Sequence, residues 1–222
     1  MAEALNLVFD LDGTLIDSVP QIHAAANIVF SANGLPGISQ ETTRDFVGNG
    51  LGVLVSRSMR HFGLKPDPAL HAELMAGFIS IYEQAFDLTT LYPAVSTTLA
   101  DLAQAGHQLA ICTNKPLGAT RAVLRHFGLD ALFPVVIGGD SLPHRKPDPA
   151  PLWAALQALG PRKALFIGDS EVDAETARAA EIPLALFSGG YRKAAPETMG
   201  ARIIFDDHAT LPRLIHEFAP RL

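Results

Sequence analysis

The features that this sequence lacks narrow the classes of protein to which it can belong. It has a single cysteine, Cys112, so no disulfide can form within the chain and a reducing compartment fits. No apolar run reaches the ~20 residues of a membrane-spanning helix. Basic residues are outnumbered by acidic ones. The chain has 17 Lys and Arg and 23 Asp and Glu, which gives a net charge of −6. Such a surface repels nucleic acid and anionic lipid, and we expect neither as a partner.

The composition indicates a folded protein with one main core. The chain has 222 residues, of which 48% are hydrophobic and 18% are charged. This is enough to bury a sizeable core with an inserted piece, and it excludes a disordered or fibrous protein. No basic segment precedes an apolar stretch near the start, where Glu3, Asp10 and Asp12 lie, so we expect no secretory signal and a cytoplasmic location. For the oligomeric state, monomer and homodimer both remain open.

Five short, continuously apolar segments predict strands that are buried on both faces of a parallel sheet. They are residues 5–9, 109–112, 135–137, 164–167 and 184–187. Segments with helical periodicity lie between the strands, and three of them end at Gly106, Gly128 and Gly160. Strands that alternate with helices predict a doubly wound α/β fold with right-handed connections.

Residues 17–91 interrupt this alternation, because they show helical periodicity and no strand pattern. We interpret them as an all-helical insert between the first and second strands. The expected organisation is therefore an α/β core domain of residues 1–16 and 92–222 with a helical cap domain of residues 17–91. An insert at this point lies where a lid over a site belongs.

Polar side chains follow four of the predicted strands. Asp10 follows the first strand, Thr113 the second, Asp140 the third after two glycines, and Asp169 the fourth after one glycine. Ligands of open parallel sheets bind beyond the carboxyl ends of the strands. We therefore expect these four groups to converge on one edge of the sheet.

The acidic residues near these strand ends predict a metal site. Asp10 and Asp12 directly follow a buried strand, where like charges are costly unless metal or protons intervene. A lone aspartate at a strand end is usually a turn or helix cap. Here Asp169 and Asp173 supply two more carboxylates, and oxygen-rich clusters of this kind suit Mg²⁺.

Four short motifs resemble those of one known superfamily. They are Asp-Leu-Asp-Gly-Thr at residues 10–14, Thr113-Asn114, Lys146-Pro147, and Gly168-Asp169 with Asp173. In order and spacing they are similar to the motifs of the haloacid dehalogenase superfamily, and the chain resembles its phosphoglycolate phosphatases over nearly the full length. The resemblance implies a Rossmann-like core with a helical cap. It also implies Mg²⁺-dependent hydrolysis of a small phosphorylated metabolite, most closely 2-phosphoglycolate, through an aspartyl-phosphate.

The resemblance further implies roles for individual residues. Asp10 is implied to be the nucleophile that attacks phosphorus, and Asp12 the general acid and base. Thr113 and the Asn114 amide are implied to bind oxygens of the transferring phosphoryl group. Lys146 is implied to neutralise charge and to contact the same group.

The metal site implied by the resemblance uses the same motifs. The side chains of Asp10 and Asp169 and the backbone carbonyl of Asp12 hold Mg²⁺, and Asp173 is either a direct ligand or a brace behind the ligands. Ionised Asp10, Asp169 and Asp173 would repel a phosphate dianion. Mg²⁺ and the Lys146 ammonium restore neutrality, so we expect the site to be inert without metal.

Several of these residues also have simpler explanations. Lys146 can lie in a solvated basic loop ahead of a helix, and Thr113 can be an ordinary strand-end hydroxyl. We expect Glu171 to favour the positive end of the helix that starts near Val172 and not to bind metal. The eight histidines lack ligand spacing, and Cys112 has no histidine partner, so neither predicts a site.

Substrate choice is expected to depend on the helical insert. Gly48, Asn49 and Gly50 precede a helix whose apolar face includes Leu54, and a glycine-rich helix start offers free amides to an anion such as a small carboxylate. A flexible turn between two helices is the alternative. Arg57 is a further candidate, although its spacing alone is equally compatible with a solvent-facing position.

Two other functions remain open on the sequence alone. A β-phosphoglucomutase-like phosphotransferase forms the same aspartyl-phosphate and passes the phosphoryl group to a sugar hydroxyl, but Thr14 favours the phosphatases over such relatives, which have Val there. A signalling receiver module also combines acidic residues, Thr and Lys on a parallel sheet. Asp12 and the helical insert argue against it, because a receiver is a single compact domain.

Overall fold

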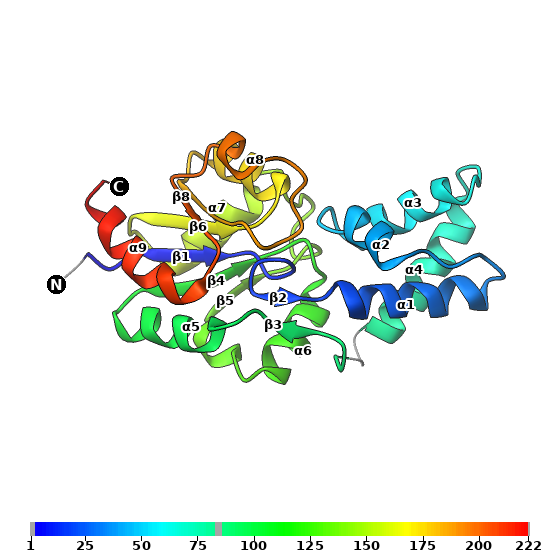
Figure 1. Cartoon of the computed structure of the whole chain (residues 1–222), viewed down its shortest axis with the longest axis horizontal. Coiled ribbons are helices and arrows are strands. Elements are labelled where there is room, and N and C mark those ends of the chain that lie inside the picture. Colours follow the sequence, from blue (N-terminus) through cyan, green and yellow to red (C-terminus); the bar gives the residue numbers. More distant parts are fainter. Residues whose placement is uncertain (1–2, 83–85, 222) are drawn as a thin grey trace. The chain divides into compact units, whose positions relative to one another are not determined.

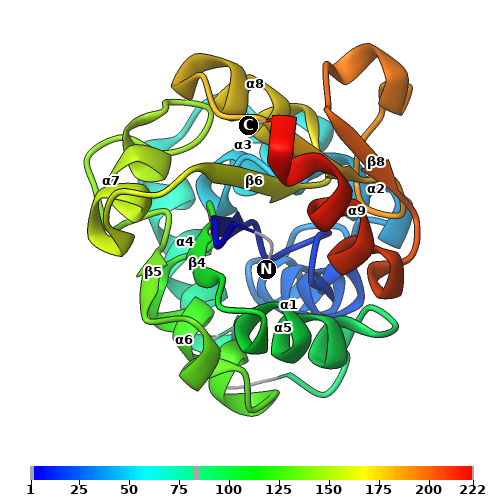
Figure 2. The same cartoon turned by 90° about the vertical axis from the view of Figure 1, so that its left-hand side faces the viewer.

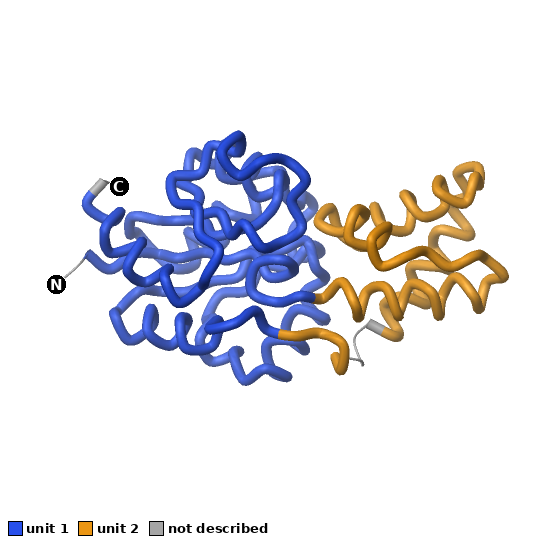
Figure 3. Tube along the Cα trace, in the orientation of Figure 1, with its two compact units in different colours: residues 1–17, 91–222 blue, residues 18–90 orange. Residues whose placement is uncertain are grey.

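The computed structural model describes residues 3–82 and 86–221, and the chain divides into two compact units (Figures 1 and 3). The first, called the core unit here, comprises Met1–Asp17 and Leu91–Leu222. The second, the helical unit, comprises Ser18–Thr90. That the helical unit acts as a cap stays a prediction.

The core unit is built on a parallel sheet of six strands, which confirms the expected α/β class. The strands are β1 (Asn6–Phe9), β4 (Gln108–Cys112), β5 (Val135–Ile137), β6 (Ala164–Gly168), β7 (Leu184–Phe187) and β8 (Ile203–Phe205). Their spatial order is β5-β4-β1-β6-β7-β8, so β1 lies between β4 and β6. Phe9 at the end of β1 pairs with Ile111 on one side and with Ile167 on the other. The residues that follow these three strands therefore emerge at the same edge of the sheet.

The edge strand β8 was not expected from the sequence. It has three residues and pairs with β7 alone, and the middle residue, Ile204, is 42% exposed. The other edge strand, β5, also has three residues and was predicted, so short length alone does not explain why β8 was missed.

Helices cover both faces of the sheet (Figure 2). The helices of the core unit are α5 (Val95–Gln104), α6 (Leu117–His126), α7 (Ala150–Leu159), α8 (Glu171–Ala180) and α9 (Leu211–Phe218). Short 3₁₀ turns occur at Asp130–Leu132, Pro196–Met199, His208–Thr210 and Ala219–Arg221. On one face α7 and α8 bury Leu152 and Ala177 against Val8 and Phe166 of the central strands. This layer of apolar contacts holds the strand ends in a fixed register.

The helical unit contains α1 (Val19–Ala32), α2 (Gln40–Phe46), α3 (Leu51–His61) and α4 (Pro68–Tyr82). Apolar side chains of α1 and α4, among them Phe30, Leu74 and Phe78, are fully buried. The helical periodicity predicts α1, α3 and α4 but not α2. That helix has seven residues, of which only Thr43 is buried, and it begins where the Ser39 hydroxyl accepts the backbone N–H of Thr42 at 3.0 Å.

A two-stranded sheet joins the segments that lead into and out of the helical unit. It pairs β2 (Ile16–Asp17) with β3 (Thr90–Leu91). The expectation of helix alone over residues 17–91 was therefore wrong at its first position, Asp17, and at its last two, Thr90 and Leu91. Two residues are too few to produce the alternation by which a strand is recognised.

The end of α8 offers a test of local backbone energetics. Glu181 has φ 59° and ψ 33°, in the left-handed region that costs a residue with a Cβ atom ~1–2 kcal/mol. We expect Glu181→Gly to stabilise the folded protein by about 0.5–1 kcal/mol, because it relieves this strain, although the greater entropy of glycine in the unfolded chain offsets part of the gain. Urea denaturation measures the change. Glu181→Ala keeps the Cβ atom and is the control, so a similar gain in that variant would contradict the explanation.

Candidate active site

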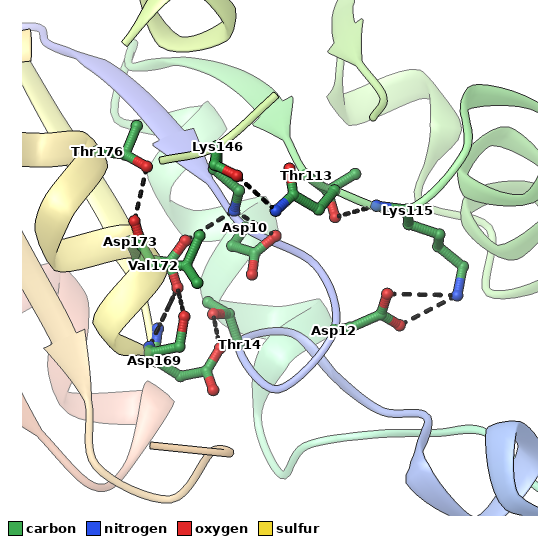
Figure 4. Close-up of polar contacts among 12 residues, drawn as sticks. Asp10, Asp12, Thr14, Thr113, Lys115, Lys146, Asp169, Val172, Asp173 and Thr176 are labelled. Atoms are coloured by element: carbon green, nitrogen blue, oxygen red, sulfur yellow. Dashed lines mark hydrogen bonds and ion pairs between the residues drawn. The ribbon is translucent and has the colours of Figure 1, made fainter. Parts of the chain in front are cut away.

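The carboxyl ends of β1, β4 and β6 bring a set of polar side chains together (Figure 4). Asp10 directly follows β1, Thr113 follows β4 and Asp169 follows β6, and all three are buried. Asp140 follows β5 at the same edge, as expected, but it lies outside this buried set. Its carboxylate is exposed and accepts the backbone N–H of Leu117 at 2.7 Å, at the first residue of α6. Asp140 therefore has the capping role that a strand-end aspartate usually has.

Three carboxylates form the centre of the site. Asp10, Asp169 and Asp173 each offer one oxygen, and these oxygens all lie within 4.8 Å of one another. Within residues 3–82 and 86–221, this is the one group of three or more His, Cys, Asp or Glu side chains with such geometry. The scattered histidines contribute no ligand to it.

The Lys146 ammonium lies against two of these carboxylates. Its Nζ is 2.9 Å from Asp10 Oδ1 and 2.7 Å from Asp173 Oδ1, and the side chain is 2% exposed. The alternative of a solvated basic loop is therefore wrong for Lys146. Burial alone would lower the pKa of Lys146, but the charges of Asp10 and Asp173 outweigh it and raise that pKa. The lysine stays protonated.

The carboxylates are not fully compensated by this one cation. Burial raises the pKa of Asp10 to about 6, although Lys146 opposes the shift. Burial, together with the charges of Asp173 and Asp10, also raises the pKa of Asp169 well above its ordinary value. Ionising all three carboxyls leaves two uncompensated negative charges beside Lys146. Two uncompensated negative charges on hard oxygen ligands match the charge and the ligand preference of a divalent cation such as Mg²⁺.

Short contacts fix the orientation of Asp169. The Thr14 hydroxyl donates to Asp169 Oδ1 at 2.8 Å, and the backbone N–H of Tyr191 donates to Oδ2 at 2.6 Å. A Cβ atom at Gly13 (φ +88°) or at Gly190 would collide with this carboxylate. These glycines let two loops close around Asp169. Sequence reasoning missed Tyr191 and Gly190, and the paired glycines after the fifth predicted strand are the signal that points to them.

Asp173 is held by hydrogen bonds from the loop before α8. Its Oδ2 accepts the backbone N–H groups of Asp169 at 3.2 Å and Ser170 at 3.1 Å, and the Ser170 hydroxyl at 2.7 Å. Its Oδ1 contacts Lys146. Both oxygens thus have protein partners, as those of Asp169 also do, and the choice between bracing and direct metal ligation by Asp173 stays a prediction.

Glu171 lies in the first turn of α8, as expected, and its side chain also has partners in another loop. It is the first residue of α8, and its Oε1 accepts the backbone N–H groups of Lys193 at 2.7 Å and Ala194 at 2.6 Å. These hydrogen bonds lower the pKa of Glu171 against the opposing effect of burial. The carboxylate therefore holds the loop that follows Tyr191 beside the site.

The loop after β4 supplies donors and a second buried lysine. The Thr113 oxygen accepts the backbone N–H of Lys115 at 3.2 Å, so the hydroxyl hydrogen can be donated elsewhere. The Asn114 side-chain amide donates to the Lys146 carbonyl at 3.0 Å and links the two loops. Lys115 Nζ lies 3.1 Å from Asp12 Oδ1. Sequence reasoning missed Lys115, although it directly follows the Thr113-Asn114 motif.

Two further residues of the core unit have supporting roles. Cys112 is fully buried, and burial raises the pKa of its thiol to about 12, so it stays protonated at neutral pH. His208 is buried beside Phe187, and its Nε2 lies 2.8 Å from the Thr14 carbonyl oxygen. Burial lowers the pKa of His208. A neutral His208 therefore donates to the loop that carries Thr14.

The glycine-rich segment of the helical unit forms the connection between α2 and α3. Gly48 has φ +106° and Gly50 has φ +86°, both outside the range that other residues favour. The Arg57 guanidinium donates to Asn49 Oδ1 at 2.8 Å and to the Phe46 carbonyl at 3.0 Å. Arg57 thus holds this connection in shape, and substrate binding by Gly48, Asn49 and Gly50 stays a prediction.

Comparisons with known proteins identify the family. The model of the haloacid dehalogenase-like hydrolases matches residues 7–187, so the chain belongs to that family and the resemblance is confirmed. A phosphoglycolate phosphatase of Cereibacter sphaeroides (strain ATCC 17025 / ATH 2.4.3) is 45% identical over 211 residues, which cover 95% of this chain and 97% of that protein. A phosphoglycolate phosphatase of Rhodobacter capsulatus is 42% identical over 209 residues, with coverage of 94% and 95%.

A solved structure supports the same assignment of the fold. The crystal structure of a predicted phosphoglycolate phosphatase from Haemophilus somnus superposes with a TM-score of 0.89 at 32% identity. The match covers 96% of this chain and 99% of that one. Among the described residues, no helix is both long enough and apolar enough to cross a membrane.

The raised pKa of Asp10 predicts a pH-dependent effect of Mg²⁺ on stability. Between the ordinary value of 3.8 and about 6, the folded protein holds a proton on Asp10 that the unfolded chain has released. Stability of the metal-free protein therefore falls as pH rises through this window. Mg²⁺ takes the place of such protons, so we expect it to raise the Tm clearly at about pH 7.5 and far less at about pH 5.

Thermal unfolding with and without Mg²⁺ at the two pH values measures this effect. Asp169→Asn should remove most of the increase in Tm at the higher pH, whereas Asp101→Asn, on the exposed side of α5, should retain it. An equal increase at both pH values, or an undiminished increase in Asp169→Asn, would show that Mg²⁺ binds elsewhere.

Proposed function

We propose that the protein is a Mg²⁺-dependent phosphatase that hydrolyses small phosphate monoesters through an aspartyl-phosphate on Asp10, with 2-phosphoglycolate as its preferred substrate. The observation that supports this most is the buried cluster of Asp10, Asp169 and Asp173 around Lys146 at the end of the central strand. The membership of the hydrolase family and the names of the relatives point to the same chemistry. We keep the expected cytoplasmic location as part of the proposal.

The first chemical step is attack by an Asp10 carboxylate oxygen on phosphorus. A bond forms between that oxygen and phosphorus while the bond from phosphorus to the ester oxygen breaks. The Lys146 ammonium, 2.9 Å from Asp10, neutralises charge on the phosphoryl oxygens. The Thr113 hydroxyl and the Asn114 amide donate hydrogen bonds to the same oxygens. Such preorganised donors supply most of the stabilisation in phosphoryl transfer.

Asp12 moves the protons of both steps. Its carboxyl gives a proton to the leaving ester oxygen. The resulting carboxylate then takes a proton from a water molecule that attacks phosphorus, as the bond from phosphorus to the Asp10 oxygen breaks and frees the Asp10 carboxylate. General acid and base catalysis of this kind contributes ~10²- to 10⁴-fold. The enzyme returns to its starting state with phosphate and the alcohol as products.

The side chains of Asp10 and Asp169 and the backbone carbonyl of Asp12 would hold Mg²⁺, with Asp173 behind them or as a further ligand. When bound, the ion neutralises carboxylate charge and so allows a phosphate dianion to approach. Asp10, Asp169 and Asp173 balance Lys146 and one divalent cation. Asp12 balances Lys115 when it is ionised. When Asp12 is protonated to act as the acid, the proposed site carries one net positive charge, which favours the approach of a phosphate dianion.

The proposal for 2-phosphoglycolate is supported by similarity to proteins that are named phosphoglycolate phosphatase. The alignment with one of them covers 95% of this chain. We propose that the backbone amides of Gly48, Asn49 and Gly50 bind the substrate carboxylate, because Arg57 keeps this connection before α3 in one conformation. Whether the enzyme is a monomer or a homodimer stays a prediction.

Replacing the nucleophile tests the chemistry. We expect Asp10→Asn to lower kcat by at least ~10³-fold, because an amide oxygen does not form the phosphoryl intermediate. Steady-state phosphate release from 2-phosphoglycolate measures this. Asp140→Asn, at a strand end outside the cluster, is the matched control and should keep at least half of the activity. Comparable activity in both variants would assign the nucleophile to another residue.

A panel of phosphorylated metabolites tests the substrate. With Mg²⁺, we expect kcat/KM for 2-phosphoglycolate to exceed that for sugar phosphates and other small esters by at least ~10-fold, and excess EDTA should abolish turnover. Phosphate should be released without any sugar cofactor. A flat profile would indicate a generalist, and transfer to a sugar hydroxyl in place of water would indicate a phosphotransferase.

A further inference from the structure

A second buried lysine, Lys115, makes an ion pair with Asp12. Its Nζ lies 3.1 Å from Asp12 Oδ1 and 3.4 Å from Oδ2, so the ammonium faces both oxygens of that carboxylate. The Lys115 side chain is 2% exposed and the Asp12 side chain is 14% exposed. Figure 4 shows this pair to one side of Asp10, while Lys146 contacts Asp10 and Asp173.

Three hydrogen bonds hold the backbone of Lys115 in place. Its N–H donates to the Thr113 oxygen at 3.2 Å. Its carbonyl accepts the backbone N–H of Gly139 at 2.8 Å and the Thr120 hydroxyl at 3.3 Å. Lysine normally keeps its ammonium in water. A buried ammonium on a fixed backbone instead places a positive charge at a defined position. Here that position is next to the Asp12 carboxylate.

Asp12 needs such an anchor because its immediate neighbours repel it. It lies two residues after Asp10, within a turn in which the Gly13 N–H donates to the Ile16 carbonyl at 2.8 Å. The three clustered carboxylates carry the same charge as Asp12 when they are ionised, and the Lys146 ammonium contacts only Asp10 and Asp173 among them. Without Lys115, rotation of the Asp12 side chain toward solvent would relieve this repulsion and move the carboxylate from its place.

We propose that Lys115 is a positioning residue that holds the Asp12 carboxyl group where it meets the ester oxygen of the substrate. The inference rests on the proposed function, in which Asp12 gives its proton to that oxygen as the bond to phosphorus breaks. In the second step Asp12 takes a proton from water as water attacks the phosphorylated Asp10. Lys115 transfers no proton itself and acts only through its contact with Asp12.

The test compares two substrates that differ in their need for a proton. The alkoxide that leaves 2-phosphoglycolate must be protonated, whereas p-nitrophenolate leaves p-nitrophenyl phosphate without a proton. With 2-phosphoglycolate, we expect Lys115→Met to lower kcat by ~10²-fold with little change in KM, because misplacement of a catalytic group by about 1 Å costs this much.

With p-nitrophenyl phosphate we expect a different pattern in Lys115→Met. Formation of the aspartyl-phosphate should keep its wild-type rate and release one nitrophenolate per enzyme in a burst. Slow turnover should follow, because hydrolysis of the intermediate still needs Asp12 as the base. Lys163→Met is the matched control, since Lys163 pairs with Glu3 at the surface, and it should behave as the wild type.

A double-mutant comparison keeps the inference testable if the single variant folds poorly. In an Asp12→Asn background, Lys115→Arg and Lys115→Met should cause no further loss, because a residue that acts only through Asp12 has nothing left to position. In the wild-type background Lys115→Arg should retain more activity than Lys115→Met. Additive losses would show that Lys115 acts independently of Asp12 and would overturn the inference.

Other outcomes also separate the alternatives. A raised KM for 2-phosphoglycolate with unchanged kcat would mean that Lys115 binds the substrate carboxylate, and a slower burst would mean that it supports the phosphoryl site. Unchanged kinetics would mean that the ion pair has no function. Each of these results would overturn the inference about Lys115. The proposed function would still hold, provided that the wild-type enzyme hydrolyses 2-phosphoglycolate. A wild-type enzyme that hydrolyses neither ester would overturn both.

Discussion

The burial of three carboxylates around one ammonium is the constraint on which the organisation of the core unit depends. Removing each charge from water costs several kcal/mol unless it is paired and hydrogen-bonded. Lys146 compensates Asp10 and Asp173, while Asp169 relies on hydrogen bonds from Thr14 and Tyr191. Burial nevertheless leaves the pKa of Asp10 and of Asp169 raised. The site is therefore incomplete electrostatically without a further cation, and the apolar core around β1 must supply the stability that this arrangement costs.

The parallel sheet makes this arrangement possible because it fixes the ends of β1, β4 and β6 side by side. The side chains at these ends divide into a cluster served by Lys146 and a separate pair of Asp12 and Lys115. In the proposed mechanism the first group forms and stabilises the bond to phosphorus, and the second moves protons. Two lysines on different loops thus keep carboxylates of equal charge in different roles, as environments do in other acid and base pairs.

The sequence predicts five of the six strands, since each lies in a short and mostly apolar segment, and it predicts polar residues after four of them. It does not predict β8 or α2, because a half-exposed edge strand and a short polar helix have little pattern. Lys115 and Asp12 are 103 positions apart, so their pairing emerges only when β1 and β4 lie side by side. Tyr191 acts through its backbone N–H, which no side chain reveals. The sequence does not separate Asp140 from the residues of the site, because aspartate serves both as a helix cap and as a site ligand.

The most direct measurement is to locate the phosphoryl group on the wild-type enzyme. The enzyme is quenched with acid during turnover of 2-phosphoglycolate with Mg²⁺, and its peptides are mapped by mass spectrometry. We expect one phosphoryl group, on Asp10, that disappears when the substrate is exhausted. A phosphoryl group on another residue, or steady turnover with no phosphorylated peptide, would contradict a covalent role for the carboxylate at the end of β1.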